Sequence, residues 1–140
     1  MGPPMLATMA ARGTETASAA VLRIGISLVF LWFGVNQILR PDAFLGWLPD
    51  WVFNLPVSEQ VVVQVHGFAE AFLAAALAIG VLTRVSAILL AGQLLAILAS
   101  IIALGSMEIA IRDFGILVGT LAVAIRGADP LALDSWRSKD

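Results

Sequence analysis

Four long apolar stretches constrain this chain more than any other feature. They cover about residues 19–39, 61–82, 85–104 and 109–125, and each is followed by a polar or turn-forming residue. A helix needs about 20 apolar residues to cross the roughly 30 Å hydrocarbon core of a bilayer, and none of the stretches alternates with the period of a strand. The pattern predicts an all-α integral membrane protein, a four-helix bundle with one domain over residues 19–127.

The overall composition supports the same environment. Hydrophobic residues make up 60% of the 140 residues and charged residues 13%, whereas about a quarter of a soluble domain is charged. The absence of cysteine excludes thiol redox chemistry and thiolate metal sites within this chain. The formal charge of −2 does not favour nucleic acid, so the lipid bilayer is the partner that the composition predicts.

The distribution of Lys and Arg predicts the orientation. Cytoplasmic loops of membrane proteins are enriched in these residues. Two of the eight, Arg40 and Arg112, fall on one side of the predicted spans, and the other six fall on the opposite side: Arg12, Arg23, Arg84, Arg126, Arg137 and Lys139. We therefore expect both termini in the cytoplasm of a cell with the protein in its inner membrane, as in bacteria. Residues 1–18 are expected to form a disordered tail and residues 128–140 a second tail.

The connection between the first two spans is the only long one. It carries Phe44, Trp47, Trp51 and Phe53, and aromatic residues are enriched where a bilayer meets water. We interpret it as an amphipathic segment lying in the headgroup layer. The alternative is a lid over a binding site between the helices.

Polar residues from several spans fall at similar predicted depths. Glu70 lies about 14 Å below the outer edge of its span, and a charge at the bilayer centre costs at least about 2.5–3.5 kcal/mol. Such side chains are expected to face the bundle interior and pair. The outer-half cluster predicted on this basis contains Glu70, His66, Arg112, Asp113, Gln37, Asn36 and, approaching it from below, Gln93.

Within this cluster, Arg112 is the predicted partner of Glu70, because a guanidinium matches a carboxylate with two hydrogen bonds. Asp113 is expected to compete for Arg112 or to pair with Gln37, and the alternative for Arg112 is a side chain extended to the outer headgroups. His66 and Glu70 share a helix face at i, i+4, so they are candidates to hold a polar headgroup or pass a proton; the alternative for His66 is an ordinary interfacial residue. One His with scattered carboxylates does not predict a metal site.

Small residues predict close helix packing. The fourth span contains a G-x-x-x-G from Gly115 to Gly119, and the second aligns Gly67 with Ala71, Ala74, Ala75 and Ala78. Small residues let membrane helices approach one another. These faces could meet within one chain or between copies.

A series of short motifs runs through most of the chain. It starts with Arg23-Ile-Gly25, Phe33 to Gln37, Pro41 and Phe44, continues with Glu70, Gly80, Thr83, Arg84 and Ala87, and ends with Asp113, Gly127 and Leu133-Asp134. In this order and spacing the chain resembles the DoxX family of small four-span membrane proteins. The family pattern has a lysine where Gln37 stands, so the outer cluster of this chain lacks that cation.

The resemblance implies a four-span fold and a link to redox systems, since DoxX-like proteins are similar to membrane subunits of a thiosulfate:quinone oxidoreductase. We expect an accessory or ligand-binding subunit that receives a quinone-like headgroup without any covalently bound cofactor, next to other membrane or redox subunits or further copies of itself. Without cysteine or a flavin motif it is not expected to be catalytic alone. The alternatives are a structural scaffold subunit of a larger membrane complex and a small proton-coupled exporter.

Overall fold

The computed structural model describes residues 3–137, which are all-α, with no strand among them. Lys139, one of the cations used to predict the orientation, lies outside these residues. The described elements, in chain order, are α1 (Pro3–Leu39), η1 (Pro41–Trp47), η2 (Asp50–Asn54), α2 (Glu59–Ile79), α3 (Thr83–Ala103), α4 (Met107–Arg126) and α5 (Leu133–Arg137), where η denotes a 3₁₀ helix.

Local sequence explains where the long helices end. Pro41 follows the last residue of α1 by two positions, and a proline disfavours helical backbone at the residue before it. The helices α2 and α4 are each followed by a glycine with positive φ, Gly80 at 77° and Gly127 at 78°. Gly80 has the left-handed conformation that commonly ends a helix, whereas Gly127 has an extended ψ of −154°, which glycine also adopts readily. The helix bounds therefore lie close to those predicted from the apolar stretches, except at the N-terminus.

Residues 3–18 are helical in the structure, so the prediction of a disordered tail over residues 1–18 is wrong for this part. They continue α1 without a break, and the Thr14 and Thr16 hydroxyls donate to the carbonyls of Ala11 and Arg12 at 2.8 and 3.0 Å. Alanine-rich sequence has a high helix propensity. Because the following span already supplies the helix nucleus, extending it requires propagation only.

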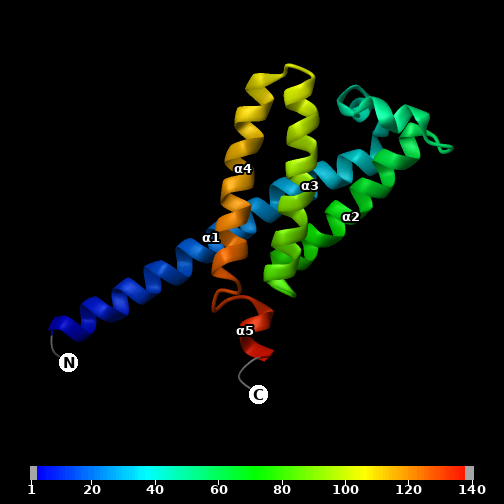
Figure 1. Ribbon diagram of the computed structural model, residues 1–140. Helices are drawn as coiled ribbons and strands as arrows, with labels where there is room; N and C mark the ends of the chain where they lie inside the picture. Colours follow the sequence, from blue (N-terminus) through cyan, green and yellow to red (C-terminus); the bar gives the residue numbers. More distant parts are fainter. Residues whose placement is uncertain (1–2, 138–140) are drawn as a thin grey trace.

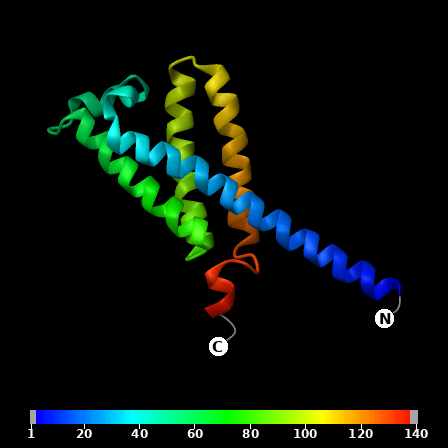
Figure 2. The same ribbon diagram turned by 180° about the vertical axis from the view of Figure 1, so that it is seen from behind.

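The four long helices form two antiparallel pairs (Figure 1). In both views α1 runs beside α2 and α3 beside α4, and the first pair crosses the second obliquely (Figures 1 and 2). The N-terminal end of α1, the α2–α3 turn and α5 lie at one end of the molecule (Figure 1). The α3–α4 turn lies at the other end, on the same side as η1 and η2. We call these the α5 end and the η end.

Glycines set the distance between α1 and α2. A Cβ at Gly34 would lie 2.6 Å from the Ala71 backbone nitrogen, and one at Gly67 would lie 2.7 Å from the Gln37 Cβ. These small residues therefore allow close helix contact within one chain, as in other membrane helices. In the G-x-x-x-G of α4 only Gly119 lies against another helix, where an added Cβ would be 2.8 Å from Ile26 Cδ1. A Cβ added at Gly115 would have nothing within 4 Å.

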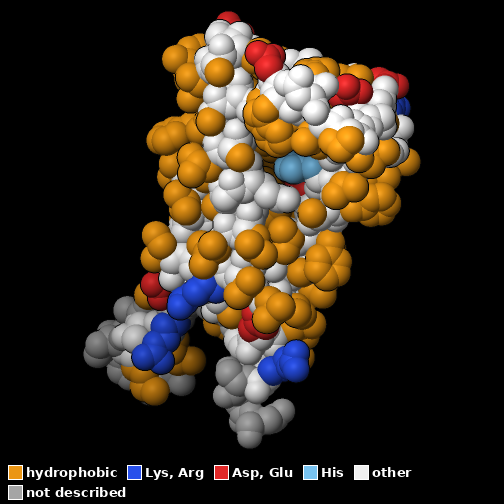
Figure 3. All heavy atoms as spheres, turned by 45° about the vertical axis from the view of Figure 1, so that its right-hand side comes forward, with side chains coloured by type: hydrophobic (Ala, Val, Ile, Leu, Met, Phe, Trp, Pro, Cys, Tyr) orange, Lys and Arg blue, Asp and Glu red, His pale blue; other side chains and the backbone are white. Residues whose placement is uncertain are grey.

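The hydrophobic surface of the molecule indicates a membrane environment. A core of aliphatic residues and Phe30, including Leu77 and Leu90, lies between the helices, yet large side chains such as Phe72 (74% exposed) and Ile125 (80%) point outward. Figure 3 shows how much of one face is hydrophobic. Such a surface is suited to lipid contact and not to water. The protein is therefore a multi-pass membrane protein in contact with lipid.

Three of the described helices are long and apolar enough to cross a bilayer: Thr8–Leu39, Glu59–Ile79 and Thr83–Ala103. The fourth long helix, α4, has 20 residues but carries Glu108, Arg112 and Asp113 in its first two turns. With these charges α4 is more polar than the other three long helices, although it packs along α3 in the same way (Figure 1).

Candidate functional site

A cavity of about 500 Å³ lies toward the η end, where the two helix pairs diverge. Its wall is mainly apolar, with residues from α1, α2, α3 and α4 and from both 3₁₀ helices, among them Phe30, Val63 and Ile97. Seven side chains with a charged, amide, imidazole or hydroxyl group also line it. Ser100 is outside the predicted cluster, and the other six belong to it: Gln37, His66, Glu70, Gln93, Arg112 and Asp113. The two pairs thus bring together groups that are far apart in sequence.

Gln37 joins His66 to Glu70 at one side of the cavity. The Gln37 Nε2 donates to Glu70 Oε2 at 2.5 Å, and its Oε1 lies 2.7 Å from His66 Nδ1. The direct distance between His66 Nδ1 and Glu70 Oε2 is 3.9 Å. Glu70 and Gln37 are buried, whereas His66 is partly exposed, and Figure 3 shows the histidine colour within a recess of the hydrophobic face. We call these three residues the Gln37 triad.

Arg112 does not pair with Glu70, so that prediction is wrong. Its Nε and Nη2 both lie 2.7 Å from Asp113 Oδ1, and its guanidinium lies 5.6 Å from the centre of the Phe33 ring. Asp113 is buried and wins the expected competition for Arg112, while the Arg112 side chain remains 53% exposed. The reason is helix packing: α4 contacts α3 and α1, and the close α1–α2 contact places Gln37 beside Glu70 instead.

The two remaining amides of the predicted cluster differ. Asn36 donates to the carbonyl of Trp32 at 2.8 Å on its own helix and does not line the cavity. Gln93 lines the cavity from α3, and its Oε1 is buried without a hydrogen-bond partner among the described residues. A buried polar atom without a partner costs free energy, so Gln93 marks a position where a ligand or water would be favoured.

The long connection contributes to the wall of the cavity. Phe44, Trp47, Trp51 and Val52 line it from η1 and η2, and Asp42 accepts a hydrogen bond from Gln60 Nε2 at 3.2 Å. The aromatic residues of this segment are partly exposed as well. The headgroup-anchor and lid interpretations both remain predictions, and one segment has the geometry for both.

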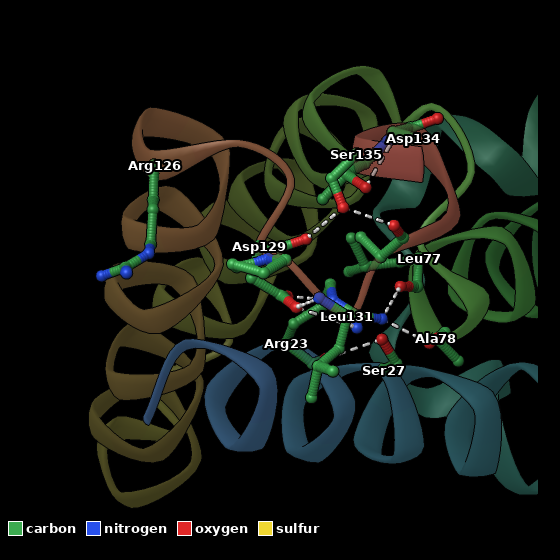
Figure 4. Close-up of polar contacts among 12 residues, drawn as sticks. Arg23, Ser27, Leu77, Ala78, Arg126, Asp129, Leu131, Asp134 and Ser135 are labelled. Atoms are coloured by element: carbon green, nitrogen blue, oxygen red, sulfur yellow. Dashed lines mark hydrogen bonds and ion pairs between the residues drawn. The ribbon is translucent and has the colours of Figure 1, made fainter. Parts of the chain in front are cut away.

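Sequence analysis missed a second buried polar cluster, near the α5 end. Arg23 Nε donates to Asp129 Oδ2 at 2.6 Å, and both side chains are almost fully buried, at 3% and 2% exposure. The Arg23 Nη1 donates to the carbonyls of Leu77, at 2.9 Å, and Ala78, at the end of α2 (Figure 4). From the sequence, Arg23 served to predict orientation and as a motif residue, and no partner was predicted for it. Its position four residues inside an apolar stretch is the signal that could have indicated a buried partner.

Asp134 holds the C-terminal segment against the α2–α3 turn. Its carboxylate accepts from the backbone nitrogens of Leu82 and Thr83, at 3.0 and 2.7 Å, and from the Thr83 hydroxyl at 2.9 Å. Ala132 is fully buried beside Gly80, where an added Cβ would lie 2.4 Å from the Ala132 Cβ. The segment predicted as a second tail therefore contacts the bundle through Asp129, Ala132 and Asp134, and it ends in α5, which has no buried residue.

Hydrogen bonds keep both aspartates of this segment charged. Burial raises the pKa of Asp129, but the hydrogen bonds from Arg23 and from the Leu131 backbone nitrogen outweigh it, so its pKa lies below the usual value. Burial also raises the pKa of Asp134, and the hydrogen bonds from Thr83 and Leu82 outweigh it in the same way. Charged acceptors make the stronger hydrogen bonds, which fits a structural role.

The chemical options of the cavity follow from its groups. Over residues 3–137 no three His, Cys, Asp or Glu side chains converge to hold a metal ion. The Gln37 triad, the Arg112–Asp113 pair and Gln93 offer hydrogen bonds and charge within an apolar wall. Binding sites for small organic molecules have this composition, with a few polar groups that fix the orientation of an apolar ligand.

Comparison with known families agrees with the architecture. The DoxX family model matches residues 18–105, which is more than half of the chain, and the chain therefore belongs to the DoxX family of small membrane proteins. Motif residues Gly34, Glu70, Gly80, Thr83 and Arg84 lie within this range, whereas Asp113 and Asp134 lie beyond it. No curated protein and no solved structure gives a significant match to the chain.

Proposed function

We propose that this DoxX-family membrane protein binds the headgroup of a quinone-like amphipathic molecule in the cavity and serves as an accessory subunit of a membrane redox system. The observation that carries the proposal is the Gln37 triad, a set of hydrogen-bonding side chains within an apolar cavity of about 500 Å³. This volume falls in the usual range for small organic ligands, about 300–1,000 Å³.

The proposed ligand fits the distribution of polarity in the cavity. A ring with oxygen substituents would place them against His66 and Gln93, and its apolar side would contact Phe30, Val63 and Ile97. An electron carrier of this kind supplies the redox chemistry when bound. The residues of this chain would bind and orient it, and a partner subunit would exchange electrons with it, since the sequence has no cysteine.

The proposal includes a four-span arrangement with α4 as the fourth span. The 20 residues of α4 correspond to about 30 Å, enough for the hydrocarbon core, and its Arg112–Asp113 pair lies near the η end. Lys and Arg side chains gather toward the α5 end in the face shown in Figure 3. By the positive-inside tendency the α5 end with both termini is cytoplasmic, and the η end faces outward from a bacterial inner membrane.

Tryptophan fluorescence offers a direct test. Trp47 and Trp51 line the cavity, whereas Trp136 lies in α5. A short-chain ubiquinone analogue added to the purified protein in lipid nanodiscs should quench the fluorescence with saturation. The saturable part should shrink in Trp47→Phe and persist in Trp136→Phe. Quenching without saturation, equal in both variants, would refute a specific site.

A pair of charge-neutralising variants separates binding from a scaffold role. Glu70→Gln should weaken the quinone analogue several-fold, because Glu70 accepts the hydrogen bond that orients Gln37 toward His66. Glu108→Gln makes the same change on an exposed residue that does not line the cavity and should leave affinity unchanged. If Glu70→Gln alters assembly with partner subunits but not affinity, the scaffold alternative is favoured and the proposal fails.

A further inference from the structure

Gln37 determines which nitrogen of His66 carries the proton. The Gln37 Nε2 donates to Glu70, so the other end of the amide, Oε1, faces His66 Nδ1 at 2.7 Å. An amide oxygen only accepts hydrogen bonds, and the proton of this bond must therefore belong to Nδ1. In neutral His66 the other ring nitrogen, Nε2, is then an acceptor.

The cavity presents further acceptors without donors of their own. His66 Nε2 has no partner among residues 3–137, and the Gln93 Oε1 is buried without one. Among the donors nearby, the Gln37 amide bonds Glu70 and the Ser100 hydroxyl donates to Ala96 at 3.3 Å. Arg112 donates to Asp113 from Nε and Nη2 and keeps the N–H groups of Nη1. Gln93 retains its amide N–H groups, but its buried oxygen is the unsatisfied atom.

We infer that the cavity selects ligands whose ring carries hydroxyl groups, such as a hydroquinone or an alkylphenol, over ligands whose ring carries only carbonyl oxygens. This inference rests on the proposed function and specifies its ligand. A hydroxyl donates to His66 Nε2 or to Gln93 Oε1, whereas a carbonyl would face these acceptors without a hydrogen bond. The buried Gln93 Oε1, left without a donor, disfavours the wrong ligand strongly.

Three ring compounds test whether the cavity prefers a hydroxyl to a carbonyl oxygen, and none of them requires an enzymatic reaction. 4-Nonylphenol and 4-nonylanisole have the same ring and chain, and only the phenol has a hydroxyl proton. Nonyl-1,4-benzoquinone supplies carbonyl oxygens alone. Affinity is measured by fluorescence of the nanodisc-embedded protein, and the phenol should bind about tenfold more tightly than either of the others.

Two variants locate the effect. Gln93→Leu should reduce the preference for the phenol over the anisole several-fold, because it removes the buried oxygen. Asn36→Leu makes the same kind of change at an amide that bonds to Trp32 and does not line the cavity, and it should leave the preference unchanged. The wild-type comparison of probes does not depend on either variant folding.

The outcomes distinguish the inference from the function on which it rests. If phenol and anisole bind equally, or the quinone binds more tightly than the phenol, the inference is overturned and the cavity remains a binding site. If none of the three probes binds with saturation, the proposed function fails, and the inference fails with it. Tighter binding of the phenol that Gln93→Leu diminishes and Asn36→Leu retains supports the inference.

Discussion

Replacing Asp129 by leucine tests the buried ion pair near the α5 end. The substitution removes the partner of Arg23 Nε and leaves a guanidinium at 2% exposure with only the carbonyls of Leu77 and Ala78 as acceptors. Removing one member of a buried pair typically costs about 3–5 kcal/mol, because the remaining charge is uncompensated. The loss of the hydrogen bond from Leu131 acts in the same direction. We expect Asp129→Leu to lose about 3–5 kcal/mol of unfolding free energy.

The double variant Arg23→Met, Asp129→Leu is the decisive comparison. It removes both charges and fills much of the same volume, and such replacements are often neutral or stabilising. Unfolding of each variant in mixed micelles, followed by circular dichroism as the fraction of denaturing detergent rises, gives the free energies. Arg126→Met, at an exposed guanidinium, is the control. A double variant as unstable as Asp129→Leu would refute the argument, because the cost would then not come from an unpaired charge.

Three further predictions follow from single contacts. Folding lowers the pKa values of Asp129 and Asp134 from 3.8. Their contribution to stability is therefore complete above pH 3.8 and is lost as the pH falls through the lower pKa values of the folded state. The thermal unfolding midpoint should decline between about pH 5 and about pH 3, and a midpoint that stays constant would contradict this prediction. Gly67→Val would place a Cβ 2.7 Å from the Gln37 Cβ. We expect it to separate α1 from α2 and to weaken binding of the ubiquinone analogue. The control Gly92→Ala, whose added Cβ has nothing within 4 Å, should bind the analogue normally. Arg112→Met removes the partner of Asp113. Because the Arg112 side chain is 53% exposed, solvent screens this pair, and a loss of only about 1 kcal/mol is expected by the detergent assay. A loss as large as that of Asp129→Leu would contradict this reasoning.

Hydropathy predicted the helices because each long apolar stretch needs internal hydrogen bonds in lipid. The signals Arg40-Pro41 and Arg126-Gly127 predicted two helix ends closely. The second span was predicted to continue to residue 82, before Thr83-Arg84, whereas α2 ends at Ile79, before Gly80. The N-terminal extension of α1 was not predictable in the same way, since a weakly polar, alanine-rich segment becomes helical only because a stable helix follows it.

Depth along the helices predicted which polar residues share a cavity but not how they pair. Six of the seven residues proposed from depth line the cavity, and Asn36 does not. The pairing of Arg112 with Asp113 and of Glu70 with Gln37 depends on the rotation of each helix about its axis and on contacts such as Gly34 with Ala71. A rise per residue contains no information about rotation between helices, so these partners require the structure.

The motifs that the chain shares with the DoxX pattern meet mostly away from the cavity. Thr83 donates a hydrogen bond to Asp134, and Gly80 leaves space for Ala132. Gly127 lies beside the Arg84 guanidinium, where an added Cβ would be 3.0 Å from Arg84 Nη2. Each of these contacts fixes the α2–α3 turn to the C-terminal segment and therefore the fold.

Gln37 differs, because it replaces the lysine of the pattern and lies in the cavity. A lysine ammonium has no acceptor and could not receive the proton of His66 Nδ1 as Gln37 Oε1 does. A lysine would instead give Glu70 a cationic partner and leave the His66 tautomer undetermined. Membership of the family thus accounts for the architecture of this protein, whereas the hydrogen-bonding character of its cavity depends on a residue in which it departs from the family pattern.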